Sequence, residues 1–149
     1  MDLVNDHDIV AIGAGSGLGR GVARRLIADG ARLTVLEISG TKADALRAEF
    51  GDAALVVQGD AAQLGDLQRC RAAHLERYGK LDALMCFQGV FDGNVPIADI
   101  DEGAIDALFD ELFHINVKSS ILAARVFLEA LQDRGGAIVL TSSNAAYAA

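Results

Sequence analysis

Basic side chains are scarce in this chain. Its 149 residues carry 13 Lys and Arg against 21 Asp and Glu, which gives a formal net charge of −8 and an isoelectric point near 4.7. Proteins that bind nucleic acid or anionic membranes by charge need clustered Lys and Arg to neutralise phosphates. We therefore expect neither kind of partner, and we expect any bound phosphate to be held mainly by backbone dipoles.

Metal-binding and redox patterns are also missing. The two cysteines, Cys70 and Cys86, match neither a zinc site nor a redox pair in their spacing. The histidines His7, His74 and His114 form no i, i+4 pair, so no metal site is expected. We interpret the cysteines as small apolar core residues and His74 as a helix-surface residue. Two reduced thiols are typical of a cytoplasmic protein.

No hydrophobic run approaches the roughly 18 residues that a membrane span needs. The segment 1–8 is acidic where a secretory signal would be basic. We therefore expect a cytoplasmic protein. A hydrophobic fraction of 52% and a single proline favour one well-buried domain over residues 1–149.

Short apolar runs alternate with helical patterns along the chain. Runs that are apolar at every position are typical of parallel strands covered on both faces, and right-handed crossovers return each one to the same sheet. The sequence therefore predicts an α/β fold of the Rossmann type, a doubly wound parallel sheet with strand order 3-2-1-4-5. The expected strands are 9–12, 33–36, 54–57, 83–87 and 137–140. The expected helices are 18–29, 64–78, about 102–132, and a short one that Ser39 or Thr41 caps and whose apolar positions include Ala45, Leu46 and Phe50.

A glycine-rich turn joins the first expected strand to the first helix. Glycines permit positive φ and let backbone N–H groups approach a diphosphate, while the helix N-terminus adds partial positive charge. Between a strand and a helix, such a turn indicates a dinucleotide site rather than a merely flexible loop. The residues expected to hold the diphosphate are Gly13, Ser16, Gly17, Leu18 and Gly19.

Two carboxylates end the next two strands. Glu37 is placed to accept hydrogen bonds from both hydroxyls of an adenosine ribose and to repel a 2′-phosphate. Positions 38–40 hold no Arg, so NAD is preferred over NADP as the expected cofactor; the alternative is a solvated surface carboxylate. Asp60, followed by Ala61, either accepts from the adenine amino group or caps the next helix, and both interpretations remain open.

Taken together, these motifs resemble the amino-terminal part of the short-chain dehydrogenase/reductase family. The family's Thr-Gly-x-x-x-Gly-x-Gly pattern matches here with Ile12 in place of Thr, and the resemblance covers essentially all of the chain. The matching residues are Gly13, Gly17, Gly19, Asp60, Asn116 in Ile115-Asn116-Val117-Lys118, and Thr141-Ser142-Ser143.

The resemblance implies the roles of several residues. Asn116 would position a proton-relay water and Ser143 would hold the substrate oxygen, while Gly89 would let the backbone approach the nicotinamide ribose. The family's acid/base Tyr and its Lys are expected beyond Ala149, and Tyr147, with no Lys behind it, is not assigned that role. We therefore expect the chain alone to be inactive; a non-catalytic NAD-binding module and an inert fragment of a longer dehydrogenase remain alternatives.

Within the family, the segments 109–118 and 143–145 resemble cis-dihydrodiol dehydrogenases of aromatic degradation, which oxidise a cyclic cis-diol to a catechol with NAD. A secondary alcohol of this kind is thus the expected substrate. Cys86-Phe87-Gln88-Gly89 replaces the family's Asn-Asn-Ala-Gly, so Phe87 lacks the hydrogen bonds of that Asn. One apolar stripe at helical spacing is expected to be core first: Leu108, Leu112, Ile115, Ile121, Leu122, Val126 and Leu131. Relatives also pair this long helix between subunits, so the resemblance implies a homo-oligomer of the full-length protein, with part of the stripe facing the partner.

Overall fold

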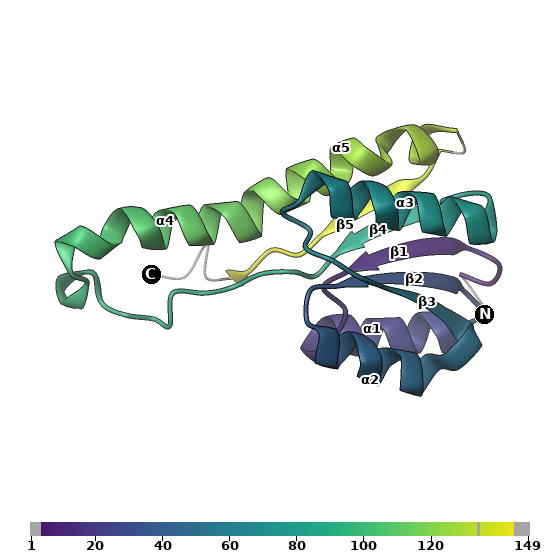
Figure 1. Ribbon diagram of the computed structural model, residues 1–149, viewed down its shortest axis with the longest axis horizontal. Coiled ribbons are helices and arrows are strands. Elements are labelled where there is room, and N and C mark those ends of the chain that lie inside the picture. The colour runs from purple at the N-terminus through teal and green to yellow at the C-terminus, as the bar shows by residue number, and fades with distance from the viewer. Residues whose placement is uncertain (1–3, 134, 145–149) are drawn as a thin grey trace.

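Parallel strands form the centre of the computed structural model, which describes residues 4–133 and 135–144 (Figure 1). In this described part the sheet has the order β3-β2-β1-β4-β5, and Ile12 of the central strand lies opposite Leu36 on one side and Cys86 on the other. The predicted Rossmann-type fold and strand order are confirmed. The strands are β1 (Asp8–Ile12), β2 (Arg32–Glu37), β3 (Ala54–Gln58), β4 (Ala83–Cys86) and β5 (Ala137–Leu140).

Helices cover both faces of the sheet. The helices α1 (Gly17–Ala28) and α2 (Gly40–Phe50) pack on one face, and α3 (Leu64–Tyr78) and α5 (Ser119–Gln132) on the other (Figure 1). Each face has its own apolar cluster, one including Ile9 and Leu46 and the other including Leu84 and Phe127. The strand β1 is buried at every position, so its residues Ile9 to Ile12 form an unbroken apolar run after the buried Asp8.

Helix boundaries follow the expected signals closely. Ser39 caps α2, where its side chain accepts from the Lys42 N–H at 3.4 Å. Gly30 follows α1 with φ +87°, a conformation that other residues rarely adopt. The strand β4 ends at Cys86, one residue earlier than expected, although the Phe87 N–H still donates to the Ile12 carbonyl at 2.8 Å.

The long helical region expected over 102–132 is divided into several parts. A 3₁₀ turn (Glu102–Ala104) leads into α4 (Ile105–Phe113), and a π-helical turn (His114–Lys118) joins α4 to α5. Such π turns occur frequently at functional sites. The helix α4 projects beyond the sheet and has no buried residue (Figure 1). The predicted apolar stripe is therefore core only in part: Val126 and Leu131 are buried, whereas Ile121 is 62% exposed.

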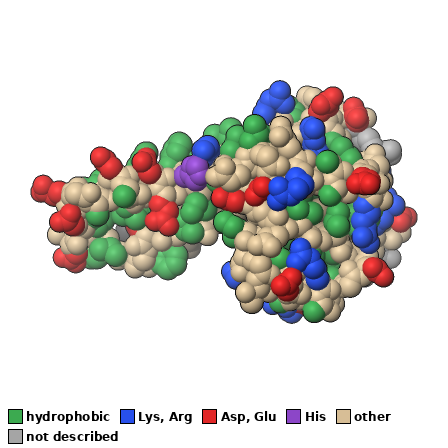
Figure 2. Space-filling view, viewed as in Figure 1, with side chains coloured by type: hydrophobic (Ala, Val, Ile, Leu, Met, Phe, Trp, Pro, Cys, Tyr) green, Lys and Arg blue, Asp and Glu red, His purple; other side chains and the backbone are tan. Residues whose placement is uncertain are grey.

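Charge is distributed unevenly over the molecule. The sequence has no Lys or Arg between Leu81 and Val117. Acidic side chains accordingly dominate the projecting part around α4, while Lys and Arg lie over the body of the domain (Figure 2). The exposed basic side chains of the domain are thus concentrated on the part that contains the sheet.

His74 is buried, which corrects its expected place on a helix surface. Its Nδ1 lies 2.8 Å from Thr34 Oγ1, and its Nε2 lies 2.9 Å from the carbonyl oxygen of Lys80. Because a carbonyl can only accept, Nε2 carries the proton and Nδ1 accepts from Thr34. Burial lowers the pKa of His74. The sequence spacing could have predicted this burial. The buried face of α3 consists of residues at helical spacing, namely Leu67, Cys70 and His74.

Both cysteines are buried and free, as the sequence predicted. Burial raises the pKa of the Cys70 thiol to about 12 and that of Cys86 to about 11. Neither thiol is therefore ionised near neutral pH. In the described ranges, no helix combines the length and hydropathy of a membrane span, and no three metal-binding side chains come together.

Candidate functional site

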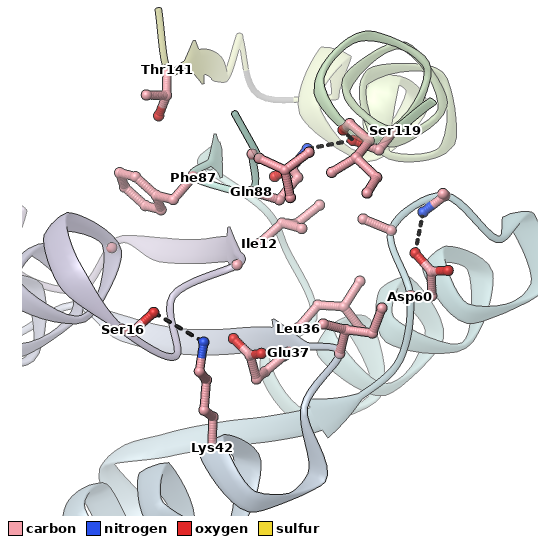
Figure 3. Close-up of a pocket in the computed structure, with 18 of the residues that line it drawn as sticks. Ile12, Ser16, Leu36, Glu37, Lys42, Asp60, Phe87, Gln88, Ser119 and Thr141 are labelled. Carbon is pink, nitrogen blue, oxygen red and sulfur yellow. Dashed lines mark hydrogen bonds between the residues drawn. The ribbon is translucent and has the colours of Figure 1, made fainter. Parts of the chain in front are cut away.

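A cavity of about 670 Å³ opens at the carboxyl ends of the strands (Figure 3). It lies where the strand order reverses on either side of β1, the edge at which parallel sheets of this topology bind ligands. Its walls come from the glycine-rich turn, the ends of β2, β3 and β4, and the π turn. The expected site residues among its lining are Gly13, Ser16, Gly17, Leu18, Gly19, Glu37, Asp60, Ala61 and Gly89.

The glycine-rich turn passes close to the end of β4. Gly13 has φ +73°, and a Cβ there would lie 2.7 Å from the backbone nitrogen of Gln88. Only glycine therefore fits at this point. The helix α1 begins at Gly17, and the first amides of a helix have no intrahelical acceptor. The start of α1 thus offers N–H groups and partial positive charge to an anion in the cavity.

Glu37 packs against this turn. Its Oε2 accepts from the Gly15 N–H at 2.9 Å and its Oε1 accepts from the Ser39 N–H at 3.0 Å. Only 5% of the residue is exposed, so it is not the solvated surface carboxylate that was the alternative. Each carboxylate oxygen can accept more than one hydrogen bond, so both remain able to bind a hydroxyl. The acidic end of β2 is thereby held at the cavity wall by backbone amides.

Asp60 and Ala61 line the cavity from the loop after β3. Asp60 does not cap α3, because that helix begins at Leu64 with Gln63 at its N-cap. Instead, Asp60 Oδ1 accepts from the Ala62 N–H at 2.8 Å. This short turn orients the carboxylate before the helix starts, and the interpretation of Asp60 as a ligand acceptor remains a prediction.

Asn116 ties the π turn to the loop after β4. The Val90 N–H donates to Asn116 Oδ1 at 2.8 Å, and Asn116 Nδ2 donates to the Val90 carbonyl at 2.9 Å. This two-way contact runs beside Gly89, where a Cβ would lie 3.3 Å from Asn116 Oδ1. The side-chain amide of Asn116 therefore holds the loop against the helix, next to the cavity rather than on its described lining.

The segment after β5 reaches the cavity through Thr141. The Thr141 hydroxyl donates to the Cys86 carbonyl at 2.8 Å, which holds the segment against the end of β4. Ser143, the expected substrate-orienting residue, is exposed and does not belong to the described lining of the cavity. Tyr147 lies outside the described residues.

Gln88 is a site residue whose contacts the sequence did not reveal. Its Nε2 donates to Ser119 Oγ at 2.9 Å and to Ser120 Oγ at 3.2 Å, which joins the end of β4 to the first turn of α5. Its Oε1 is buried and has no hydrogen-bond partner among the described residues. Although Phe87 offers no side-chain hydrogen bond, the adjacent Gln88 thus makes a polar contact between strand and helix. In the sequence, only the departure of this segment from the family's Asn-Asn-Ala-Gly pattern indicated that Gln88 could have a special role.

Lys42 is a second residue that sequence spacing could not place. It lies in the first turn of α2, and its Nζ donates to Ser16 Oγ at 3.2 Å across the mouth of the cavity (Figure 3). The two residues are 26 positions apart. Such a contact depends on how α2 packs beside α1, which no local motif encodes.

Comparisons with known proteins agree with this architecture. A family model described as short chain dehydrogenase matches residues 8–149. Cis-2,3-dihydrobiphenyl-2,3-diol dehydrogenase of Pseudomonas sp. (strain KKS102) is 41% identical over 147 residues, which cover 99% of this chain and 53% of that protein. The 3-phenylpropionate-dihydrodiol/cinnamic acid-dihydrodiol dehydrogenase of Photorhabdus laumondii subsp. laumondii is 37% identical over 147 residues, which cover 99% of this chain and 52% of that protein.

Solved structures show the same fold. The crystal structure of levodione reductase superimposes with a TM-score of 0.85 at 26% identity, covering 97% of this chain and 57% of that one. The chain spans about half the length of the curated relatives that it matches. Since the family model extends over residues 8–149 and the sheet order and glycine-rich turn agree with it, the chain belongs to the short-chain dehydrogenase family.

Proposed function

We propose that this chain forms the NAD-binding part of a dehydrogenase that transfers a hydride between a secondary alcohol and nicotinamide. The observation that carries the proposal is the glycine-rich turn packed against Glu37, on one wall of a cavity at the reversal point of the sheet. This arrangement supplies amides for a diphosphate and a fixed acceptor for a ribose. When bound, the nicotinamide would accept or return the hydride.

The shape of the turn supports a dinucleotide as the ligand. Side chains at Gly13 and Gly15 would collide with Gln88 and Glu37, so glycines let the turn pack against the strand ends. The residues that follow, Ser16 to Leu18, are exposed along the cavity, where a diphosphate would rest. The buried carboxylate of Glu37 favours two ribose hydroxyls over a 2′-phosphate, because like charges repel. NAD is therefore the proposed cofactor, with NADP bound more weakly.

A cis-dihydrodiol is the proposed substrate class. Two relatives carry names that describe dehydrogenases of such diols. The apolar side chains of Phe87, Val90 and Ile115 line the cavity and suit a hydrophobic ring. In this proposal Asn116 positions a relay water and Ser143 holds the substrate oxygen. The complete protein would be a cytoplasmic homo-oligomer, joined in part through the exposed apolar side chains of α4 and α5.

Two measurements test the proposal. Calorimetric titration of this chain should show NAD binding, with weaker binding of NADP, and no binding of either would refute the nucleotide site. The complete gene product, supplied with NAD and a cis-dihydrodiol, should produce the absorbance of reduced cofactor. Nucleotide binding without turnover in the complete protein would favour a non-catalytic NAD-binding module and would exclude the substrate.

A further inference from the structure

Lys42 is the one permanently cationic side chain among the described residues that line the cavity. The other two charged side chains of this lining, Glu37 and Asp60, are carboxylates. Without Lys42, the side chains around the cavity would carry only negative charge, and a bound phosphate would be attracted by amide dipoles alone. A single cation in this position adds an attractive charge for a phosphate beside the start of α1.

The geometry directs Lys42 towards the start of α1. Its side chain extends from α2 to Ser16, and Figure 3 shows its amino group directed at the Ser16 hydroxyl. Ser16 occupies the N-cap of α1, yet its hydroxyl makes no capping bond to that helix. The ammonium group has three donors, and Ser16 Oγ takes one of them. The others remain for an acceptor near the helix N-terminus.

The charge of Lys42 is not cancelled by an ion pair within the described residues. Cations nearby are paired: Arg20 and Arg24 with Glu49. Lys42 has no carboxylate within salt-bridge distance in these ranges, and both oxygens of Glu37 accept backbone amides instead. The ammonium group therefore forms no ion pair in these ranges and lies on an exposed residue at the mouth of the cavity.

We propose that Lys42 binds a phosphate group of the nucleotide directly. This inference rests on the proposed function and adds a charged side chain to the backbone dipoles that were expected to hold the phosphate mainly. Lys42 lies between the diphosphate-binding turn and the ribose acceptor Glu37, so its partner is the diphosphate common to NAD and NADP or the 2′-phosphate that NADP alone carries. In either case it is a specificity-determining residue, because it distinguishes phosphorylated ligands from a bare nucleoside.

Titration of a Lys42→Met variant tests the inference. The matched control is Arg125→Met, which removes the same charge from an exposed site on α5 away from the cavity. NAD, NADP and adenosine serve as ligands at low and at high salt. Loss of one charge-assisted hydrogen bond should raise the Kd about tenfold for the phosphorylated ligand that Lys42 binds. The Kd for adenosine should stay within about twofold, and the difference should shrink at high salt.

The pattern of the loss identifies the phosphate. An equal loss for NAD and NADP assigns the diphosphate, and a loss for NADP alone assigns the 2′-phosphate. Lys42→Arg, which retains the charge, should restore most of the affinity. Lys42→Met with wild-type affinity for both dinucleotides, or with an equal loss for adenosine, would overturn the inference while leaving the proposed function in place. Failure of the wild-type chain to bind either dinucleotide would instead defeat the proposed function.

Discussion

Replacing Gly15 by Ala tests whether the contact between Glu37 and the glycine-rich turn gives the cavity its shape. A Cβ at position 15 would lie 2.2 Å from Glu37 Oε2 and 2.5 Å from its Cδ, whereas ordinary contact begins at 3.4 Å. The carboxylate would have to retreat by roughly 1 Å. That displacement breaks the hydrogen bond in which the Gly15 N–H donates to Oε2.

The size of the effect follows from the burial of this bond. It joins an amide to a carboxylate of which only 5% is exposed, so water cannot easily replace the lost donor. We expect Gly15→Ala to lower the free energy of unfolding by about 1.5–3 kcal/mol, the contribution of a hydrogen bond to a charged group. Because Glu37 also leaves its place at the cavity wall, the Kd for NAD should rise at least about tenfold. Urea unfolding and calorimetric titration measure the two quantities.

A second glycine offers a matched control. Gly21 lies within α1, and a Cβ there would meet nothing within 4 Å. Gly21→Ala should therefore stabilise the fold by about 0.5–1 kcal/mol, because Ala loses less conformational entropy in a helix. Its NAD affinity should equal that of the wild type. If Gly15→Ala behaved like this control, the turn would relax without penalty and the role assigned to the Glu37 contact would be refuted.

Burial of His74 makes stability depend on pH. Because burial lowers its pKa in the folded state, the unfolded state binds more protons below its own pKa of about 6.5. The neutral, buried His74 therefore costs no stability above that pH, and the free energy of unfolding falls as the pH drops below it. His74→Leu should flatten this dependence of the free energy of unfolding on pH. The thiols of Cys70 and Cys86 should resist alkylation until urea unfolds the chain. The strand β5 ends the described sheet, and an exposed apolar edge strand can pair with a second copy of the chain. Val139 on β5 is 46% exposed, so Val139→Lys should reduce self-association as measured by light scattering.

Each of these results has a clear opposite. A variant lacking His74 that keeps the wild-type pH slope would assign that slope to other groups. Rapid alkylation of the native protein would mean that the cysteines open to solvent on the timescale of the reaction. A wild-type chain that scatters as a monomer would show that the exposed face of β5 does not promote pairing.

The parts of the structure that the sequence predicted depend on local signals. The unbroken run at 9–12 reports a strand buried on both faces, and the glycines that follow can only serve a tight turn into α1. Glu37 could be placed at the cavity because it ends a strand, and all parallel strands end at the same edge. His74 could have been placed as well, since its spacing from Leu67 and Cys70 is that of a buried helix face.

The remaining features arise from contacts that sequence spacing does not encode. The hydrogen bond from Lys42 Nζ to the Ser16 hydroxyl joins residues that are 26 positions apart. The hydrogen bond between the Asn116 side chain and the Val90 backbone spans the same separation. The π turn at His114–Lys118 is only five residues long, too short for a periodic pattern of its own, so the sequence predicts one continuous helix there. Tertiary packing decides all three.

The paired bonds between Asn116 and Val90 also divide the site into two parts that can change separately. Beyond Val90 the chain turns outward, where Phe91 is 76% exposed and Ile97 is 81% exposed. Because the start of this loop is held by the hydrogen bonds of Val90 with Asn116, the exposed residues that follow can accept insertions or new side chains without straining the turn at Gly13. Variation at this end of the cleft can thus be explored while the proposed nucleotide site at the other end stays the same.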